Sequence, residues 1–224
     1  MRLLLLLCLL VMTICHVYLC SASNRYDIAG GVVVTTPIYP FYVLLLTKGI
    51  DSFESHCGGV LVAPQWILTA GHCLDGGVDS NFSLPITELY AAIGIYDRSN
   101  ISNVTSITHR VLHPQWVIGS SDFVDLAMVK LESPATHVNP IKLPGIRDEF
   151  NTGDLLKVIG FGSRTPDGSR SSVLVEADVE IVEWSNCLID GVPKFKQCLY
   201  YGECICAGKG DGVDSCNGDR LDML

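Results

Sequence analysis

Short apolar runs alternate with turn-forming residues along most of the chain. Runs rich in Val, Ile, Leu, Phe and Tyr are separated by clusters of Gly, Pro, Asn, Asp and Ser, which is typical of many-stranded antiparallel proteins. We find no long stretch with helical periodicity and no repeat. The pattern predicts strands over residues 41–46, 60–62, 89–93, 126–129, 157–159 and 173–182. The predicted fold class is therefore all-β.

A proline-containing connection, residues 132–144, separates two strand-rich halves of the chain. With 224 residues, of which 48% are hydrophobic, the chain can bury one sizeable core or two smaller ones. Because strands are predicted on both sides of the connection, we expect two domains, over residues 28–135 and 136–224.

The N-terminal segment has the pattern of a signal peptide. A basic residue, Arg2, precedes an apolar run from residue 3 to about residue 19, and small residues follow at positions 21–23. A signal anchor is the alternative, since the run approaches spanning length, but Thr13 and His16 interrupt it and no basic cluster follows. We expect residues 1–23 to be removed, and the protein to be secreted with no stable membrane association.

Charge and glycosylation patterns bear on partners and compartment. The formal net charge of −9 provides no footprint for phosphate backbones, so no nucleic-acid partner is expected. Asn81, Asn100 and Asn103 each begin an acceptor pattern for N-glycans, which agrees with the secretory route.

Ten cysteines in a secreted chain indicate disulfide bonds. Three of them lie in residues 1–23 and seven remain, an odd number that leaves at least one thiol without a partner in the chain. A zinc site of Cys198, Cys204 and Cys206 is the alternative, but no histidine or fourth cysteine has a suitable spacing. We therefore expect no metal and no other cofactor.

Two stretches carry candidate chemistry. In residues 57–73, CGGVLVAPQWILTAGHC, His72 adjoins Cys73, which can close back onto Cys57 and hold the histidine at a strand end. In residues 125–131, DLAMVKL, Asp125 opens an apolar strand, where a buried carboxylate needs a strong donor such as a histidine ring N–H. Taken singly, His72 is more simply a structural histidine and Asp125 a turn or cap residue, and Asp122 is a competing carboxylate.

Six motifs together, in this order, resemble those of trypsin-like serine proteases. They are TAGHC (69–73), HPQW (113–116), DLAMVKL (125–131), VIGFG (158–162), CICAG (204–208) and DSCNGD (214–219). The resemblance spans residues 28–219. It implies a fold of two antiparallel β-barrels, a monomer, and protein or peptide substrates or protease inhibitors as partners.

The resemblance also implies roles for individual residues. His72 would be the general base and Asp125 the carboxylate that orients it. Asp214 would lie at the base of a specificity pocket that selects Arg or Lys side chains. Gly218 would contribute to the oxyanion hole, and Asp219 would pair with an amine freed at Ile28 by activation.

Disulfide pairing and activation are likewise implied by the resemblance. Cys57–Cys73 and Cys187–Cys206 follow the pairing of the family, which leaves Cys198 and Cys204 as an additional pair. Residues 24–27 would form a short propeptide-like segment. Its last residue is Asp27, where Arg or Lys would be expected, so the route of activation stays open.

One position departs from the family pattern. Gly218 and Asp219 are followed by Arg220, where the family has its nucleophilic serine. Arginine cannot be deprotonated to attack a carbonyl, and no G-x-S-x-G stretch supplies another nucleophile. We therefore expect this chain to be inactive as a hydrolase.

The chain ends at Leu224, and we expect it to be truncated before the last strands of an incomplete second barrel, which would leave Cys216 without its partner. The main hypothesis is a secreted trypsin-like endopeptidase, cleaving after Arg or Lys in complete relatives and represented here by an incomplete product. The second hypothesis is a non-catalytic secreted homologue that acts as a binding protein. An unrelated β-rich binding module is disfavoured, because it would require six motifs to match by accident.

Overall fold

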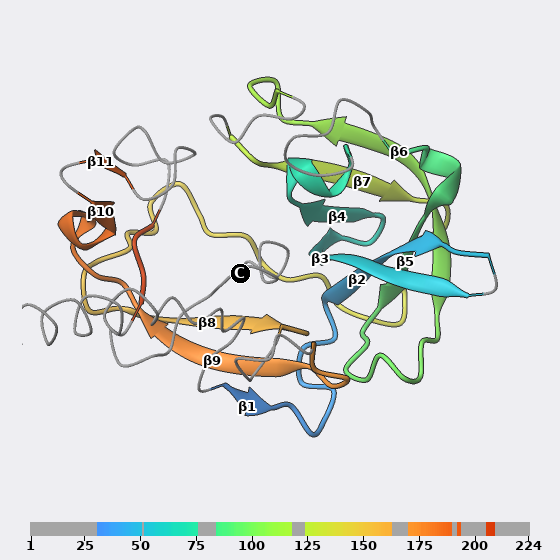
Figure 1. Cartoon of the computed structure of the whole chain (residues 1–224), viewed down its shortest axis with the longest axis horizontal. Coiled ribbons are helices and arrows are strands. Elements are labelled where there is room, and N and C mark those ends of the chain that lie inside the picture. The colour runs from blue at the N-terminus through green and yellow to red at the C-terminus, as the bar shows by residue number, and fades with distance from the viewer. Residues whose placement is uncertain are drawn as a thin grey trace, which may run out of the picture.

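Strands make up nearly all of the regular structure (Figure 1). The computed structural model describes residues 31–50, 52–75, 84–117, 124–162, 170–189, 192–193 and 205–208. Over these residues it contains strands and three short 3-10 helices, and no α-helix. The predicted all-β fold class is thus confirmed. Across the same residues, no helix has the length and apolar character needed to cross a membrane.

Six antiparallel strands close into a barrel. They are β2 (Tyr42–Lys48), β3 (Phe53–Ala63), β4 (Trp66–Thr69), β5 (Leu89–Ile93), β6 (Val104–Leu112) and β7 (Ala127–Leu131), hydrogen-bonded in the order β2-β3-β4-β7-β6-β5. Closure pairs every strand on both sides, so the barrel has no exposed sheet edge. Its interior is filled by side chains that include Val43, Leu45, Leu61, Ile67 and Val129.

A second antiparallel sheet lies beside the barrel (Figure 1). It contains β1 (Val32–Val33), β9 (Val175–Glu180) and β8 (Leu155–Gly160), in the order β1-β9-β8. A short pair, β10 (Leu188–Ile189) and β11 (Val192–Pro193), follows the 3-10 helix η3 (Trp184–Cys187). A closed barrel with a second sheet agrees with the predicted trypsin-like architecture. The domain boundary itself stays a prediction, although residues 132–154, between β7 and β8, contain no strand.

Strand β2 is buried on both faces. Val43 and Leu45 point into the barrel core, whereas the alternate side chains Tyr42, Leu44 and Leu46 belong to a second cluster. This cluster also contains Val34, Ala92, Ile95, Ile159, Phe161 and Leu174. The rings of Tyr42 and Phe161 meet edge to face, with their centroids 5.6 Å apart. Because both faces of β2 are covered, its sequence is a continuous apolar run without alternation.

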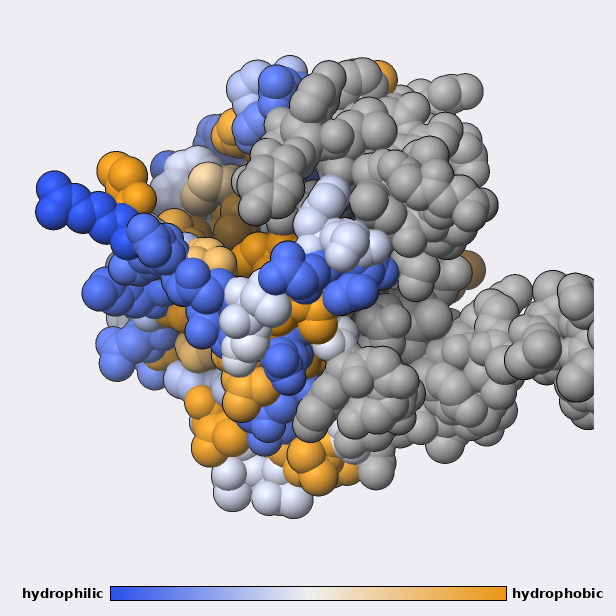
Figure 2. All heavy atoms as spheres, turned by 90° about the vertical axis from the view of Figure 1, so that its left-hand side faces the viewer, coloured by the Kyte–Doolittle hydropathy of each residue, from blue (hydrophilic) through white to orange (hydrophobic). Residues whose placement is uncertain are grey.

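The face on the left of Figure 1 is shown directly in Figure 2. Among the coloured residues, hydrophobic side chains lie in small groups separated by hydrophilic ones. Scattered apolar residues of this kind are normal on protein surfaces and do not indicate a docking site.

Candidate active site

His72 lies in a tight turn directly after a barrel strand. Strand β4 ends at Thr69, Ala70 is extended, and the 3-10 helix η1 (Gly71–Cys73) carries the histidine. The Thr69 hydroxyl donates to the Gly58 carbonyl oxygen at 2.8 Å, and this bond joins the end of β4 to β3. Sequence analysis expected His72 at a strand end, and the structure places it three residues beyond the end of β4, in η1.

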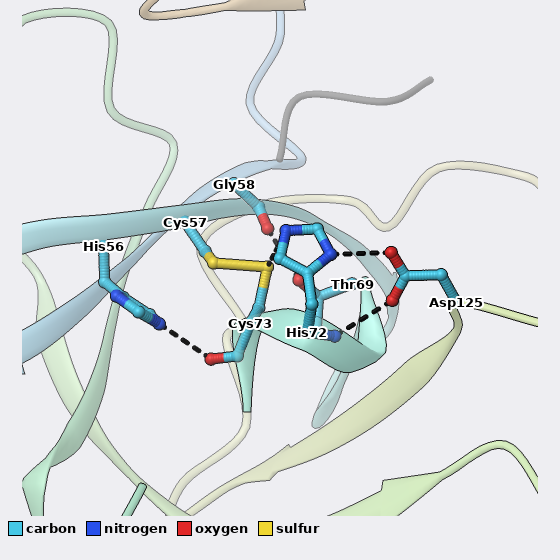
Figure 3. The surroundings of a disulfide bond; sticks show 7 residues. All are labelled: His56, Cys57, Gly58, Thr69, His72, Cys73 and Asp125. Atoms are coloured by element: carbon cyan, nitrogen blue, oxygen red, sulfur yellow. Dashed lines mark hydrogen bonds and ion pairs between the residues drawn. A yellow bond between two sulfur atoms is a disulfide. The ribbon is translucent and has the colours of Figure 1, made fainter. Parts of the chain in front are cut away.

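A disulfide bond holds the same turn from the side of β3. Cys57 on β3 is bonded to Cys73, with 6.0 Å between the two Cα atoms, and both residues are buried. Next to this bond, Nε2 of His56 donates to the Cys73 carbonyl oxygen at 2.8 Å (Figure 3). The predicted Cys57–Cys73 bond is therefore present, and it is reinforced by a histidine that sequence analysis did not single out.

The carboxylate of Asp125 binds His72 through two hydrogen bonds. Its Oδ2 accepts the ring Nδ1–H at 2.6 Å, and its Oδ1 accepts the backbone N–H of His72 at 2.9 Å (Figure 3). The two side chains are only 11% and 13% exposed. Both carboxylate oxygens are thus occupied by one residue, which fixes the rotation of the carboxylate and the plane of the imidazole together.

This arrangement determines which ring nitrogen can act as a base. Because Nδ1 donates its hydrogen to Asp125, the neutral imidazole carries its lone pair on Nε2. Nε2 lies 3.9 Å from Sγ of Cys73. A disulfide sulfur carries no hydrogen to donate, so this contact leaves the Nε2 lone pair able to accept a proton.

His56 is an uncharged neighbour of this pair. Burial lowers its pKa, the hydrogen bond to the Cys73 carbonyl partly opposes that effect, and the nearby His72 and Arg170 lower the pKa further. His56 is therefore neutral near pH 7, where it still donates through Nε2. Its place directly before Cys57 was the only sequence signal that could have drawn attention to it.

One group of side chains has the proximity expected of metal ligands. Cys57, His72 and Cys73 bring a nitrogen and two sulfurs within 4.8 Å of one another. The two sulfurs are bonded to each other, so neither is a thiolate that could coordinate zinc. The group does not fit a metal site.

Most of the other predicted site residues lie outside the described part of the chain. These are Ile28, Asn81, Cys198, Cys204, Asp214, Gly218, Asp219 and Arg220, together with the competing carboxylate Asp122. Their predicted roles stay predictions. Asn100 and Asn103 are described and exposed, and Asn103 has a positive φ of 54°.

Cys206 is buried and disulfide-bonded. The side chain of Cys187, its predicted partner, is outside the described residues. Besides Cys57–Cys73, the structure thus contains a disulfide bond at Cys206. The pairing of Cys206 with Cys187 stays a prediction.

Most of the chain is similar in sequence to known serine proteases. A sequence model of the family described as Trypsin matches residues 28–220. The chain is 34% identical to Serine proteinase stubble of Drosophila melanogaster over 209 residues, which cover 88% of this chain and 25% of that protein. It is 32% identical to Trypsin 5G1 of Aedes aegypti, over 86% of this chain and 68% of that protein. It is 31% identical to Tryptase of Mus musculus, over 98% of this chain and 81% of that protein.

Proposed function

Since this chain belongs to the trypsin family of serine proteases, we propose that His72 and Asp125 are the general base and the orienting carboxylate of that family's catalytic triad. The observation that carries the proposal is that one carboxylate accepts two hydrogen bonds from one histidine, one from its backbone N–H and one from its ring N–H. Both donors of the histidine are satisfied by the same carboxylate, which fixes the ring relative to Asp125.

The geometry suits the transfer of a proton to Nε2. A hydroxyl that attacks a peptide carbonyl loses its proton to the base as the new bond forms, and the imidazole becomes a cation. Asp125 lies on the opposite side of the ring and stabilises this cation through Nδ1. Because both side chains are largely buried, water screens this attraction only weakly.

The nucleophile is the part of the triad that this sequence lacks, so we propose that the chain does not hydrolyse peptides. Arg220 follows Gly218 and Asp219 at the position where the family motif has serine. Its guanidinium has no lone pair for attack and stays protonated at all relevant pH values. Loss of the nucleophile from such a triad lowers kcat by about six orders of magnitude.

We further propose a substrate class for the family and an extracellular location for this chain. Asp214 supports cleavage after Arg or Lys in relatives that retain the serine, because a carboxylate at the base of a pocket pairs with those side chains. Residues 1–23 and the exposed Asn100 and Asn103 support a secreted glycoprotein. Protein or peptide substrates and protease inhibitors are the corresponding partners.

A non-catalytic binding role is the second candidate. It is favoured by the combination of an ordered His72–Asp125 pair with Arg220, since such a chain keeps the architecture of the site without its reactivity. In that case the secreted chain would bind substrates or inhibitors without cleaving them. The two candidates differ in whether the chain, although it cleaves nothing, binds such a partner.

The base and the nucleophile can be tested separately on the full chain. With 15N-labelled histidine, NMR should show a far-downfield Nδ1 proton for His72, and Asp125→Asn should abolish it. Asp148→Asn is a matched control, because Asp148 is exposed and accepts a hydrogen bond from the Gly145 backbone N–H at 2.6 Å. A His72 proton that Asp125→Asn leaves unchanged would contradict the assignment of the base.

The nucleophile is tested by turnover and by covalent labelling. The chain should cleave no amide substrate with Arg or Lys before the scissile bond, and it should not react with a serine-directed phosphonate. Labelling of any serine by the phosphonate would show that another hydroxyl has replaced the one missing at position 220.

A further inference from the structure

The turn formed by residues 113–116 is hydrogen-bonded to the segment just before β7, close to Asp125. The backbone N–H of Trp116 donates to the His113 carbonyl at 2.8 Å and closes the turn. The backbone N–H of His113 donates to the carbonyl of Leu126, the residue after Asp125, at 2.9 Å. Trp116 is thus anchored to the segment that supplies the carboxylate.

The indole of Trp116 lies flat against the residue that precedes His72. A Cβ atom added to Gly71 would meet Cδ2 of the indole at 2.8 Å, and Cε2 and Cγ at 3.0 Å. Such distances are shorter than van der Waals contact, so this close approach requires glycine at position 71.

The same indole also binds the chain on the other side of His72. Its Nε1–H donates to Oδ2 of Asp75 at 2.9 Å, and Asp75 follows His72 by three residues. Trp116 is 8% exposed and Asp75 is fully buried. A buried carboxylate is costly unless it accepts strong hydrogen bonds, and the indole N–H of Trp116 supplies one of them.

We propose that Trp116 and Asp75 are positioning residues that set the approach of His72 to Asp125. The inference rests on the proposed function of that pair. His72 and Asp125 are 53 positions apart; His72 lies in η1 and Asp125 in the segment just before β7. Trp116 contacts the histidine turn at Gly71 and Asp75, and its own turn is bonded to Leu126. It therefore connects the two segments independently of the His72–Asp125 bonds.

A small displacement of either segment would matter because the Nδ1–Oδ2 distance is only 2.6 Å. Hydrogen bonds weaken steeply as they lengthen and bend, and catalytic groups must be held to within about 0.5 Å. Loss of the Trp116–Asp75 bond should therefore loosen the His72–Asp125 bond while the barrel stays folded.

The test measures exchange of the His72 Nδ1 proton with water in the folded full chain. Trp116→Phe keeps an aromatic ring against Gly71 but lacks the N–H donor, and Asp75→Leu removes the acceptor. Each should speed exchange about tenfold, the factor that corresponds to about 1.4 kcal/mol, which is near the value of a hydrogen bond to a charged group. Asp75→Asn keeps an acceptor oxygen and should restore slow exchange.

Trp66→Phe is the matched control, since Trp66 lies on β4 with its ring near Lys130 Nζ and should leave the exchange unchanged. Wild-type exchange rates in folded Trp116→Phe and Asp75→Leu would overturn the inference. Unfolding of both variants would also overturn it, because the pair would then have only a general structural role. If Asp125→Asn leaves the His72 proton unchanged, the failure lies in the proposed function of the pair and not in the role of Trp116.

Discussion

Replacing both Cys57 and Cys73 by alanine should lower stability without dismantling the site. The bond closes a loop between residues 16 positions apart. In the chain-entropy description, a cross-link over a loop of this length destabilises the unfolded state by about 3 kcal/mol. The two sulfurs are buried, so their removal also leaves small voids that add to the loss.

The turn that carries His72 keeps other attachments in this variant. Thr69 still donates to Gly58, and Nε2 of His56 still donates to the carbonyl of residue 73. We therefore expect a folded protein that has lost about 3 kcal/mol, or roughly 6–12 °C in Tm for a chain of this size. The far-downfield proton of His72 should persist.

Urea unfolding followed by tryptophan fluorescence measures this loss, with no reductant present so that the disulfide of Cys206 stays intact. Cys57→Ala alone is a matched control, since it breaks the same bond and should cost nearly as much as the double substitution. A loss below about 1 kcal/mol with an unchanged m-value would refute the loop-closure reasoning. Disappearance of the His72 proton from the folded double variant would show that the disulfide, and not Asp125, determines the geometry of the histidine.

Two further predictions concern the surroundings of His72. Gly71→Ala places a methyl group 2.8 Å from the Trp116 ring and should cost about 1–3 kcal/mol in urea unfolding, whereas Gly145→Ala, whose nearest neighbour would be 3.5 Å away, should be nearly neutral. Burial lowers the pKa of His56 from its ordinary 6.5, so the unfolded chain binds the proton more readily and stability should fall as pH drops below about 6.5. His56→Gln should reduce this loss between pH 7 and 5 and the exposed His109→Gln should not; an identical pH profile for His56→Gln would contradict the assignment.

Most strands with an apolar run were predicted from the sequence, but the apolar β4 (Trp66–Thr69) and the polar β6 were not. The runs that predicted strands correspond to β2, β3, β5, β7, β8 and β9. Strand β6 was missed because only Ile107 in it is buried, so its sequence contains no apolar run. Backbone hydrogen bonds to β5 and β7 hold this strand in the barrel. Phe53, Glu54 and Ser55 extend β3 beyond its predicted length, because they pair with the end of β2.

The candidate site shows a similar division. Local patterns drew attention to His72 and Asp125, but only the resemblance to a family joined them, since nothing in the spacing of residues 53 apart predicts a contact. The roles of His56 and Asp75 depend on contacts between separate segments, which a single sequence does not show. Trp116 was noticed as part of a motif, and its packing on Gly71 became visible only in three dimensions.

The double burial of β2 has a consequence for biosynthesis. Residues 31–131 complete the barrel strands before β8 and β9 have left the ribosome, so Tyr42, Leu44 and Leu46 on the outer face of β2 must first meet water. Val34, Ala92 and Ile95 are already present, but the cover is complete only when Ile159, Phe161 and Leu174 arrive. The nascent barrel therefore exposes apolar side chains on the outer face of β2, which chaperones can recognise. A fragment that ends at residue 131 would keep this apolar surface exposed and tend to aggregate.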